Sequence, residues 1–250
     1  MKILEVLFSP PEFAALQQRD LGKSTCVVFD ILRATTSMMM ALANGATGMI
    51  PVTQISEAIA LREKNGGILL AGERDGLRIR AALTGSIDFD FGNSPQEFTS
   101  DRVRGKRIAI TTTNGTRALQ ACAGAKTILI GSFLNLQPLA NWLAEHSPDH
   151  LILVCSGTHE QAALEDTLAA GALCEKIWTH YADEAVADSA EIARGLYSSM
   201  KSDLLGAMSH SQNGRRLLAN DALRSDVAFC VQRETLSFIA ECKDGVVQKI

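Results

Sequence analysis

Asp30, Arg33, Thr35 and Thr36 fall within seven residues, directly after an apolar run that begins at Cys26. A strand that ends in such a turn presents backbone N–H groups, two hydroxyls and a guanidinium to one small volume, which suits a phosphoryl group. The carboxylate at the strand end suits a divalent cation beside it. An Asp or Thr here can also simply cap the next helix. The clustering favours chemistry, so the four residues are candidate catalytic groups, with Asp30 also a candidate metal ligand.

A second Thr-rich turn, residues 111–116, again lies between an apolar run and a helical pattern. Its Asn114 and Gly115 tolerate the left-handed backbone that points successive N–H groups inward, so the turn can form a nest for an anion. Plain caps and hydroxyl turns have the same composition. Because two matching turns are stronger evidence than one, Thr113, Asn114, Gly115 and Thr116 are candidate substrate contacts.

Two pairs of neighbouring charged residues are further candidates for binding a metal or an anion. Glu73 and Arg74 follow another apolar run, where Glu73 can bind a metal and Arg74 a second anionic group of the substrate. An exposed ion pair explains these two equally well. Glu165 and Asp166 begin a helical pattern, where carboxylates also favour the helix dipole. Because neighbours on a helix point about 100° apart, at most one of this pair is expected to bind a metal directly. The candidate metal ligands are Asp30, Glu73, Glu165 and Asp166.

Three further polar residues lie in loops that enter helical patterns. Asn93 precedes Ser94 and Pro95, which suit an N-cap and a first helical residue. Asn93 can still reach the site, because the segment 75–91 before it is long enough to act as a lid. Ser132 and Asn135 suit either a cap or a ligand contact. Together with Arg74, these three complete the candidate substrate-binding residues.

Other phosphatase chemistries fit the residues less well. A cysteine phosphatase needs an Arg six positions after its nucleophile, but Gln161 stands six after Cys155. The pair Asp88 and Asp90 resembles the nucleophile motif of haloacid-dehalogenase-like enzymes, yet Gly92 replaces the usual Thr or Val and no strong strand precedes it. The five histidines show no zinc-binding spacing. Magnesium with oxygen ligands is the metal that the sequence favours.

A three-layer α/β/α fold with a largely parallel or mixed sheet is expected to position these residues, since short apolar strands alternate with helical patterns. The predicted strands are residues 3–8, 26–30, 49–52, 68–71, 108–112, 127–130 and 151–155. In a parallel α/β sheet the loops that leave the carboxyl ends of the strands gather at one edge, and ligands bind there.

Two segments, 27–73 and 108–157, repeat the order strand, Thr-rich turn, helix, strand, helix, strand and Gly-containing loop. The chain can thus contain two similar βαβαβ halves, although such units also resemble each other by chance. We expect one compact domain over residues 1–250, because no low-complexity linker is present. Its parts would be possible halves 1–100 and 101–180, a helical region 181–225 for packing or oligomer contact, and a hairpin region 226–250 with its turn at 243–245.

The composition excludes several classes of partner. With 24 Lys plus Arg against 28 Asp plus Glu, the net charge of −4 offers no cationic field for nucleic acid. No apolar stretch approaches the roughly 18 residues of a membrane span, and no secretion signal is apparent. Six separated cysteines without a CxxC pair are expected to be reduced core residues of a cytoplasmic protein. The expected partners are a small anionic organic phosphate and further copies of the chain, with a homodimer favoured.

Six motifs, in this order and at similar spacing, resemble the 2-phosphosulfolactate phosphatase family: residues 30–36, 72–74, 91–95, 112–116, 131–135 and 165–166. The resemblance covers about residues 27–177, and the region from Tyr181 onward matches only loosely. Arg233 and Glu234 stand where relatives are expected to have an Asp. The resemblance implies a cytosolic α/β enzyme that requires magnesium and hydrolyses 2-phospho-3-sulfolactate to 3-sulfolactate and inorganic phosphate.

Two alternatives stay open at this point: a phosphatase for other 2-phosphorylated hydroxy acids, and a non-catalytic anion-binding protein on the same scaffold. The working hypothesis places the phosphoryl group between the two Thr-rich turns, where Arg33 and magnesium neutralise its oxygens. Asp30 would act as metal ligand, nucleophile or base. Arg74 would hold the sulfonate or the carboxylate.

Overall fold

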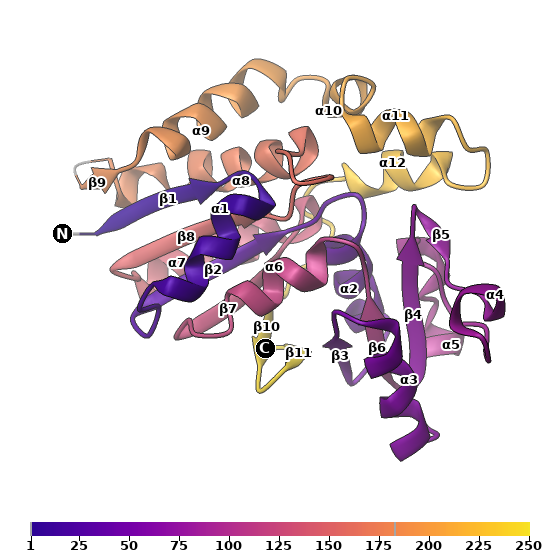
Figure 1. Ribbon diagram of the computed structural model, residues 1–250. Helices are drawn as coiled ribbons and strands as arrows, with labels where there is room; N and C mark the ends of the chain where they lie inside the picture. Colours follow the sequence, from indigo (N-terminus) through magenta and orange to yellow (C-terminus); the bar gives the residue numbers. More distant parts are fainter. Residues whose placement is uncertain (1, 183) are drawn as a thin grey trace.

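Short apolar runs form the strands of an eleven-stranded sheet, drawn as arrows in Figure 1. The structure is a computed structural model that describes residues 2–182 and 184–250. The strands predicted from the sequence are all formed, with small shifts at their ends: β1 (Ile3–Leu7), β2 (Ser24–Phe29), β3 (Gly48–Pro51), β4 (Leu69–Arg74), β6 (Arg107–Thr111), β7 (Thr127–Gly131) and β8 (His150–Cys155). The others are the short strands β5 (Leu77–Arg78), β9 (Ala185–Val186), β10 (Ala240–Lys243) and β11 (Val246–Lys249).

The sheet contains two parallel blocks that run in opposite directions. Its strand order is β5-β4-β6-β3-β11-β10-β7-β2-β8-β1-β9. Strands β4, β6 and β3 are parallel and form the small block, and strands β7, β2, β8 and β1 are parallel and form the large block. The β10–β11 hairpin lies between the blocks and pairs antiparallel with β7 and with β3. These antiparallel steps reverse the strand direction, so the sheet is mixed.

Both predicted βαβαβ units are present, and they exchange their first strands. One unit is β2, α2 (Ala34–Ala43), β3, α3 (Ile55–Lys64) and β4, and the other is β6, α6 (Gly115–Ala121), β7, α7 (Leu136–His146) and β8. Strand β2 lies between β7 and β8 of the other unit, and β6 lies between β3 and β4. The exchange places the turn after each first strand beside the loop that follows the other unit's third strand.

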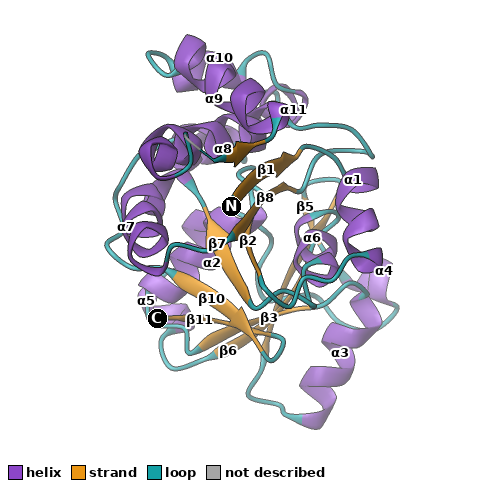
Figure 2. Cartoon of the chain, turned by 90° about the vertical axis from the view of Figure 1, so that its left-hand side faces the viewer, coloured by secondary structure: helices purple, strands orange, loops and turns teal. Residues whose placement is uncertain are grey.

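Helices cover both faces of the sheet, which confirms the three-layer α/β/α architecture (Figures 1 and 2). Successive residues of a strand point to opposite faces. Val27 and Leu153 of the large block therefore pack with α7, α8 (Leu164–Ile177) and α9 (Asp188–Met200). Their neighbours Val28 and Val154 pack with α1 (Pro10–Ala14), α2 and α6 on the other face. Helix α3 covers one face of the small block.

The remaining helices are short: α4 (Ala81–Thr84), α5 (Ser100–Val103), α10 (Leu204–Met208), α11 (Gln212–Leu218) and α12 (Arg224–Cys230). Single 3₁₀ turns occupy residues 15–18, 95–97, 133–135 and 178–180. The hairpin turn predicted at 243–245 is confirmed, and its Asp244 and Gly245 both have left-handed backbone, with φ of 51° and 75°. The segment 226–250 is not hairpin throughout, because its first residues belong to α12.

The cysteines lie largely in the core, as expected. All six are free thiols; Cys242 is partly exposed and the other five are buried. Within residues 2–182 and 184–250, no helix combines the length and the apolar character that crossing a membrane requires.

Candidate active site

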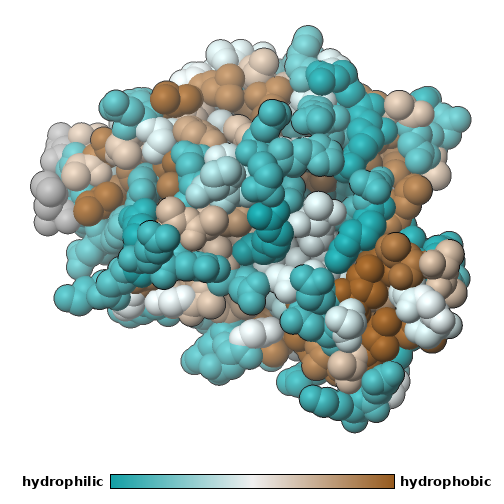
Figure 3. All heavy atoms as spheres, in the orientation of Figure 1, coloured by the Kyte–Doolittle hydropathy of each residue, from teal (hydrophilic) through white to brown (hydrophobic). Residues whose placement is uncertain are grey.

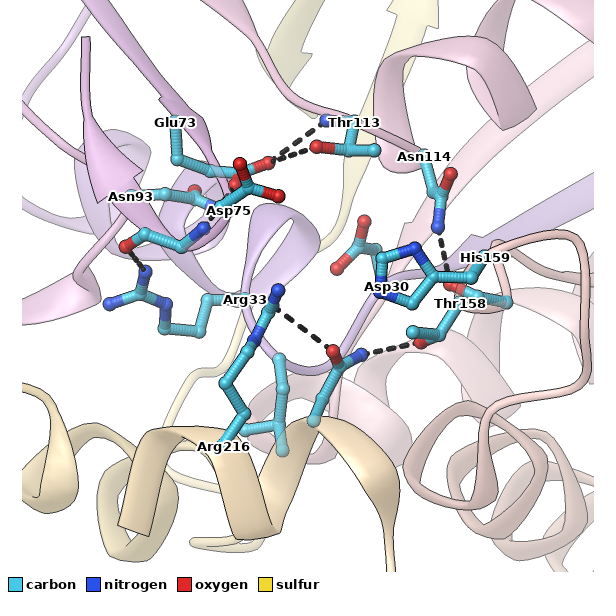
Figure 4. Close-up of a pocket in the computed structure, with 14 residues that line it drawn as sticks. Asp30, Arg33, Glu73, Asp75, Asn93, Thr113, Asn114, Thr158, His159 and Arg216 are labelled. Atoms are coloured by element: carbon cyan, nitrogen blue, oxygen red, sulfur yellow. Dashed lines mark hydrogen bonds between the residues drawn. The ribbon is translucent and has the colours of Figure 1, made fainter. Parts of the chain in front are cut away.

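A narrow polar pocket lies where loops from both blocks meet, and Figure 4 shows it in close-up. It is lined by Asp30, Leu32, Arg33, Glu73, Asp75, Gly76, Asn93, Thr113, Asn114, Gly157, Thr158, His159, Asn213 and Arg216. These residues come from the loops after β2, β4, β6 and β8, from the segment before the 3₁₀ turn at 95–97, and from α11. Five candidates other than Arg33 are thus brought together: Asp30, Glu73, Asn93, Thr113 and Asn114.

The strand-end loops converge as predicted, but a common sheet edge is not the reason. The carboxyl ends of two antiparallel blocks would lie at opposite edges of a flat sheet. The hairpin between the blocks pairs with each through a single residue pair, Glu241 with Leu129 and Val247 with Met49. Such short pairing lets the sheet turn, and the blocks lie at an angle to each other in Figure 1. The carboxyl ends of β2 and β8 can therefore face those of β4 and β6.

The two Thr-rich turns touch at Gly115. A Cβ atom there would lie 2.5 Å from Oδ2 of Asp30 and 2.8 Å from Cβ of Ala34. Any side chain at this position would therefore displace Asp30. Gly115 does not line the pocket, so its place in the structure is to let the turns approach each other.

Asp30 is the carboxylate in the middle of the pocket (Figure 4). Its Oδ1 accepts a hydrogen bond of 3.1 Å from the backbone N–H of Ala34, in the first turn of α2. Burial raises the pKa of Asp30 to about 6, and the charges of Glu73 and Glu165 add to the rise while the Ala34 hydrogen bond opposes it. Asp30 thus changes its protonation close to neutral pH, which suits a general base.

Glu73 ties the loop after β4 to the second Thr-rich turn. Its Oε1 accepts hydrogen bonds of 2.9 Å from both the backbone N–H and the hydroxyl of Thr113, and its Oε2 accepts one of 2.7 Å from the N–H of Gly76. The side chain is 7% exposed, so these donors replace the water that a buried carboxylate loses. Glu73 adds a fixed negative charge opposite Asp30.

Glu165 and Asp166 lie behind the pocket wall and do not line the pocket. Asp166 accepts hydrogen bonds from the backbone N–H groups of Ile31 at 2.8 Å and Gly157 at 3.1 Å, and so holds two pocket loops together. Oε1 of Glu165 accepts a 2.8 Å hydrogen bond from Asn213, whereas its buried Oε2 has no partner among the described residues. Burial raises the pKa of both carboxyls, and Asp30 raises that of Asp166 further.

Arg33 lines the pocket, but its guanidinium is already engaged. Its Nη1 donates to Oδ2 of Asp226 in a buried ion pair of 2.5 Å, and its Nη2 donates to the carbonyl of Gly76 at 2.8 Å. The hydroxyls of Thr35 and Thr36 donate to the carbonyls of Asp30 and Ile31, and neither lines the pocket. These threonines shape the turn that presents Asp30.

Besides Gly115, four substrate-binding candidates lie outside the pocket. The guanidinium of Arg74 donates to the carbonyls of Glu73 and Thr111 and to the Thr111 hydroxyl. Ser132 and Asn135 are fully buried and form a reciprocal capping box before α7. Thr116 donates its hydroxyl to Thr112 and faces a second, larger cavity beside the β10–β11 hairpin. Their predicted contact with substrate stays a prediction, which this geometry does not favour.

Two asparagines present amide groups to the pocket (Figure 4). Asn93 is 4% exposed, and its Oδ1 has no hydrogen-bond partner among the described residues. Asn114 donates from Nδ2 to the carbonyl of Gly157 at 2.8 Å, which joins the second Thr-rich turn to the loop after β8. A buried amide without a partner is costly unless a ligand satisfies it, so Asn93 marks the site of a bound polar group.

The sequence did not indicate three polar residues of the pocket: Asp75, Asn213 and Arg216. Asp75 and His159 have left-handed backbone, with φ of 54° and 48°, a geometry that non-glycine residues adopt rarely and often at functional sites. Asn213 and Arg216 belong to α11, in the region expected to serve packing or oligomer contact. This region also forms one wall of the pocket, a role that the sequence did not indicate.

The pocket residues fit a divalent cation. Carboxyl groups gather here: Asp30, Glu73 and Asp75 lie in the wall, and Glu165 and Asp166 lie behind it. The raised pKa of Asp30 and the unpartnered Oε2 of Glu165 show that neighbouring donors do not fully compensate their charge. The described residues contain no ready-made cluster of three His, Cys, Asp or Glu ligands. Mg²⁺ is commonly held by one or two carboxylates together with waters and phosphate oxygens, so an oxygen-lined pocket of this kind suits it.

A family model and the curated relatives that match this chain carry the same description. The family model described as 2-phosphosulpholactate phosphatase matches residues 12–245. The chain is 38% identical over 233 residues to a probable 2-phosphosulfolactate phosphatase of Symbiobacterium thermophilum, which covers 91% of this chain and 95% of the relative. A probable 2-phosphosulfolactate phosphatase of Pseudothermotoga lettingae is 37% identical over 238 residues, which covers 95% of this chain and 94% of the relative. A probable 2-phosphosulfolactate phosphatase of Caldicellulosiruptor saccharolyticus is 35% identical over 234 residues, which covers 92% of this chain and 93% of the relative. The family match includes the C-terminal helices, which the six motifs did not reach.

Proposed function

The chain belongs to the 2-phosphosulfolactate phosphatase family, and from this premise we propose that it hydrolyses 2-phospho-3-sulfolactate to 3-sulfolactate and inorganic phosphate with Mg²⁺ as cofactor. The observation that carries the proposal is the pocket around Asp30, where an ionisable carboxylate, the unpartnered amide oxygen of Asn93 and the guanidinium of Arg216 surround one small polar space. These groups suit a substrate that carries phosphoryl, carboxylate and sulfonate groups on a three-carbon chain.

Asp30 is the residue on which the chemistry depends. Its carboxylate faces the pocket, and a pKa of about 6 leaves it mostly ionised at neutral pH yet basic enough to accept a proton. It takes the proton from the attacking water as the water oxygen bonds to phosphorus and the bond between phosphorus and the C2 oxygen breaks. Protonated Asp30 then returns this proton to the C2 oxygen, so the hydroxy acid and phosphate leave with Asp30 ionised again.

Glu73 and one oxygen of the Asp30 carboxylate would hold Mg²⁺, which would leave the other oxygen of Asp30 free to accept the proton, and Glu165 lies behind them. The bound cation would supply Lewis-acid neutralisation of the phosphoryl oxygens. Phosphate monoesters need accelerations of up to ~10²¹-fold, which no single side chain provides. The amide of Asn93 and the guanidinium of Arg216 add polar partners for the anion.

Phosphate release from a panel of 2-phosphorylated hydroxy acids tests the proposal. The purified chain should release phosphate from 2-phospho-3-sulfolactate in the presence of Mg²⁺ and lose this activity when EDTA is added. A higher kcat/KM for 2-phosphoglycerate or 2-phospholactate would assign a different substrate. Release from none of them with Mg²⁺ present would refute the enzyme assignment.

We further propose that the protein acts in the cytoplasm, which the six free thiols support. The homodimer expected from the sequence stays a prediction, and light scattering coupled to size-exclusion chromatography measures it.

A further inference from the structure

We propose that Arg216 binds the sulfonate of the substrate and thereby makes the enzyme prefer sulfonated 2-phospho acids. The inference rests on the proposed function and goes further, because it assigns the specificity of the site to one residue of α11. Arg216 reaches the pocket from the wall opposite the Thr-rich turns, and Figure 4 shows its side chain extending from the helix toward Asp30.

The guanidinium of Arg216 is held in place by neighbours that leave most of its donors available. Its Nη2 donates to Oδ1 of Asn213 at 3.1 Å. Nδ2 of Asn213 donates in turn to the Thr158 hydroxyl at 2.6 Å and to Oε1 of Glu165 at 2.8 Å. Asn213 is 8% exposed, so this amide is a fixed bridge between the Glu165 carboxylate and Arg216. A preorganised guanidinium loses little entropy when it binds an anion.

Gly76 lies beside this guanidinium, and its backbone conformation rather than lack of space favours glycine there. A Cβ atom on Gly76 would lie 3.8 Å from both Cζ and Nη2 of Arg216, in ordinary contact, and the φ of +78° favours glycine there. The carbonyl of Gly76 accepts the hydrogen bond of Arg33. The two arginines of the pocket therefore lie close to the same residue.

The two arginines of the pocket differ in their ion pairing. Among the described residues, Arg33 and Arg216 are the arginines that line the pocket. Arg33 is buried and neutralised by Asp226 at 2.5 Å, whereas no carboxylate lies within ion-pair distance of Arg216 in the described part of the chain. Arg74, which the sequence suggested for this task, donates to two carbonyls and a hydroxyl outside the pocket. Arg216 is therefore the guanidinium with charge left to offer.

Among the three anionic groups of the substrate, the sulfonate is the one placed to meet Arg216. The phosphoryl oxygen and the carboxylate are both attached to C2, so they lie together and can share the cation side of the pocket near Asp30. The sulfonate is carried on C3, a separate branch from C2, so it can reach the opposite wall while the other two groups face Asp30. Its three oxygens remain anionic at any physiological pH and match the fork of a guanidinium.

The test compares 2-phospho-3-sulfolactate with 2-phospholactate, which keeps the phosphoryl and carboxylate groups but lacks the sulfonate. With Mg²⁺ present, the wild type should have the higher kcat/KM for the sulfonated compound. Arg216→Ala should lower that preference roughly 10- to 100-fold, chiefly by raising KM for 2-phospho-3-sulfolactate, because a charged hydrogen-bonding partner is lost. Arg216→Lys should retain part of the preference, since it keeps the charge without the fork.

Arg215→Ala is the matched control. Arg215 is the preceding residue of α11, is exposed, and donates to the carbonyl of His210 away from the pocket. It should leave both kcat/KM values as in the wild type. An equal loss on both compounds in Arg216→Ala, or an unchanged preference, would overturn the assignment to the sulfonate. A wild type that releases phosphate from neither compound would instead refute the proposed function, and the specificity role would fall with it.

Discussion

Asp30 shows how a small number of contacts sets the chemistry of a residue. The side chain lies at the end of a buried strand, is held by the Ala34 N–H, and faces Gly115 because no larger residue fits there. Burial and the neighbouring carboxylates raise its pKa to about 6. The same features that make it a usable base also make its charge costly in the absence of a cation.

Replacing Asp30 with Asn should abolish turnover while leaving the fold intact. The amide keeps the shape of the side chain but can neither accept a proton from water nor carry charge, so kcat should fall by about 10³-fold or more. Phosphate release with saturating Mg²⁺ measures this. Asp149→Asn is the control. Asp149 is exposed and directly precedes the amino end of β8, whereas the pocket lies beyond the carboxyl end of that strand. Near-normal kcat in Asp30→Asn would remove this residue from the mechanism.

The raised pKa values predict a pH-dependent effect of Mg²⁺ on stability. The folded-state pKa of Asp30 is about 6 against an ordinary 3.8, so the folded protein favours the protonated form. This contribution to stability is present below about pH 4 and is lost as the pH rises through about 6. Mg²⁺ would favour the ionised form and offset the loss.

The melting temperature with and without Mg²⁺ between pH 5 and pH 8 measures this linkage. Mg²⁺ should raise it by several degrees at pH 8 and by little at pH 5. Asp30→Asn should melt higher than the wild type in metal-free buffer at pH 8, because a buried charge is removed, and should respond less to Mg²⁺. An effect of Mg²⁺ that is equal at all these pH values would contradict the linkage.

At the level of single residues, only some of the predicted contacts reach the pocket. Asp30, Asn93 and Asn114 were predicted and line the pocket. Thr35 and Arg74 were predicted with equal reason, but local carbonyls take up their donors. Residue type and spacing do not show whether a hydrogen bond is already made.

Helix α12 acts on the site through Asp226. Its carboxylate accepts from Arg33 at 2.5 Å, from the Ser94 hydroxyl at 2.6 Å and from Gln96 at 3.0 Å, and so fixes α12 to the turn after β2 and to the 3₁₀ turn at 95–97. Asp226→Ala should lower the free energy of unfolding by about 3–5 kcal/mol, because Arg33 is left charged and buried.

Denaturant unfolding checks this value, with Asp221→Ala as the comparison. Asp221 forms an exposed ion pair of 2.8 Å with Arg224, and losing such a pair costs about 0.5 kcal/mol or less. A loss in Asp226→Ala no larger than in Asp221→Ala would show that the buried pair does not hold α12 in place.

The β10–β11 hairpin connects the two blocks, and its turn depends on left-handed backbone at Asp244 and Gly245. Gly245→Val should lower the free energy of unfolding by about 1–2 kcal/mol, because a β-branched residue is strained at a φ of 75°. Gly66→Ala is the control, since a Cβ there meets no atom within 4 Å and its φ is not in the left-handed region. Equal stability of the two variants in denaturant unfolding would show that the turn is not strained.

For the whole molecule, the alternation of strands and helices was enough to predict the strands, the layers and the two βαβαβ units. The exchange of first strands and the reversal between the blocks were not predictable in this way, because hydrophobic periodicity identifies a strand and not its neighbour. Arg216 and Asp226 were missed for a related reason. They are ordinary residues of short helices, and they matter only because the chain returns across the carboxyl ends of the strands.

The central claim is that loops of both blocks and α11 build one pocket that holds a cation beside Asp30 and the organic anion against Arg216. A crystal structure of the chain with Mg²⁺ and 3-sulfolactate tests it most directly. The account predicts Mg²⁺ coordinated by Asp30 and the sulfonate hydrogen-bonded to Arg216. Product bound in the larger cavity beside the β10–β11 hairpin, or a cation with no contact to Asp30, would contradict it.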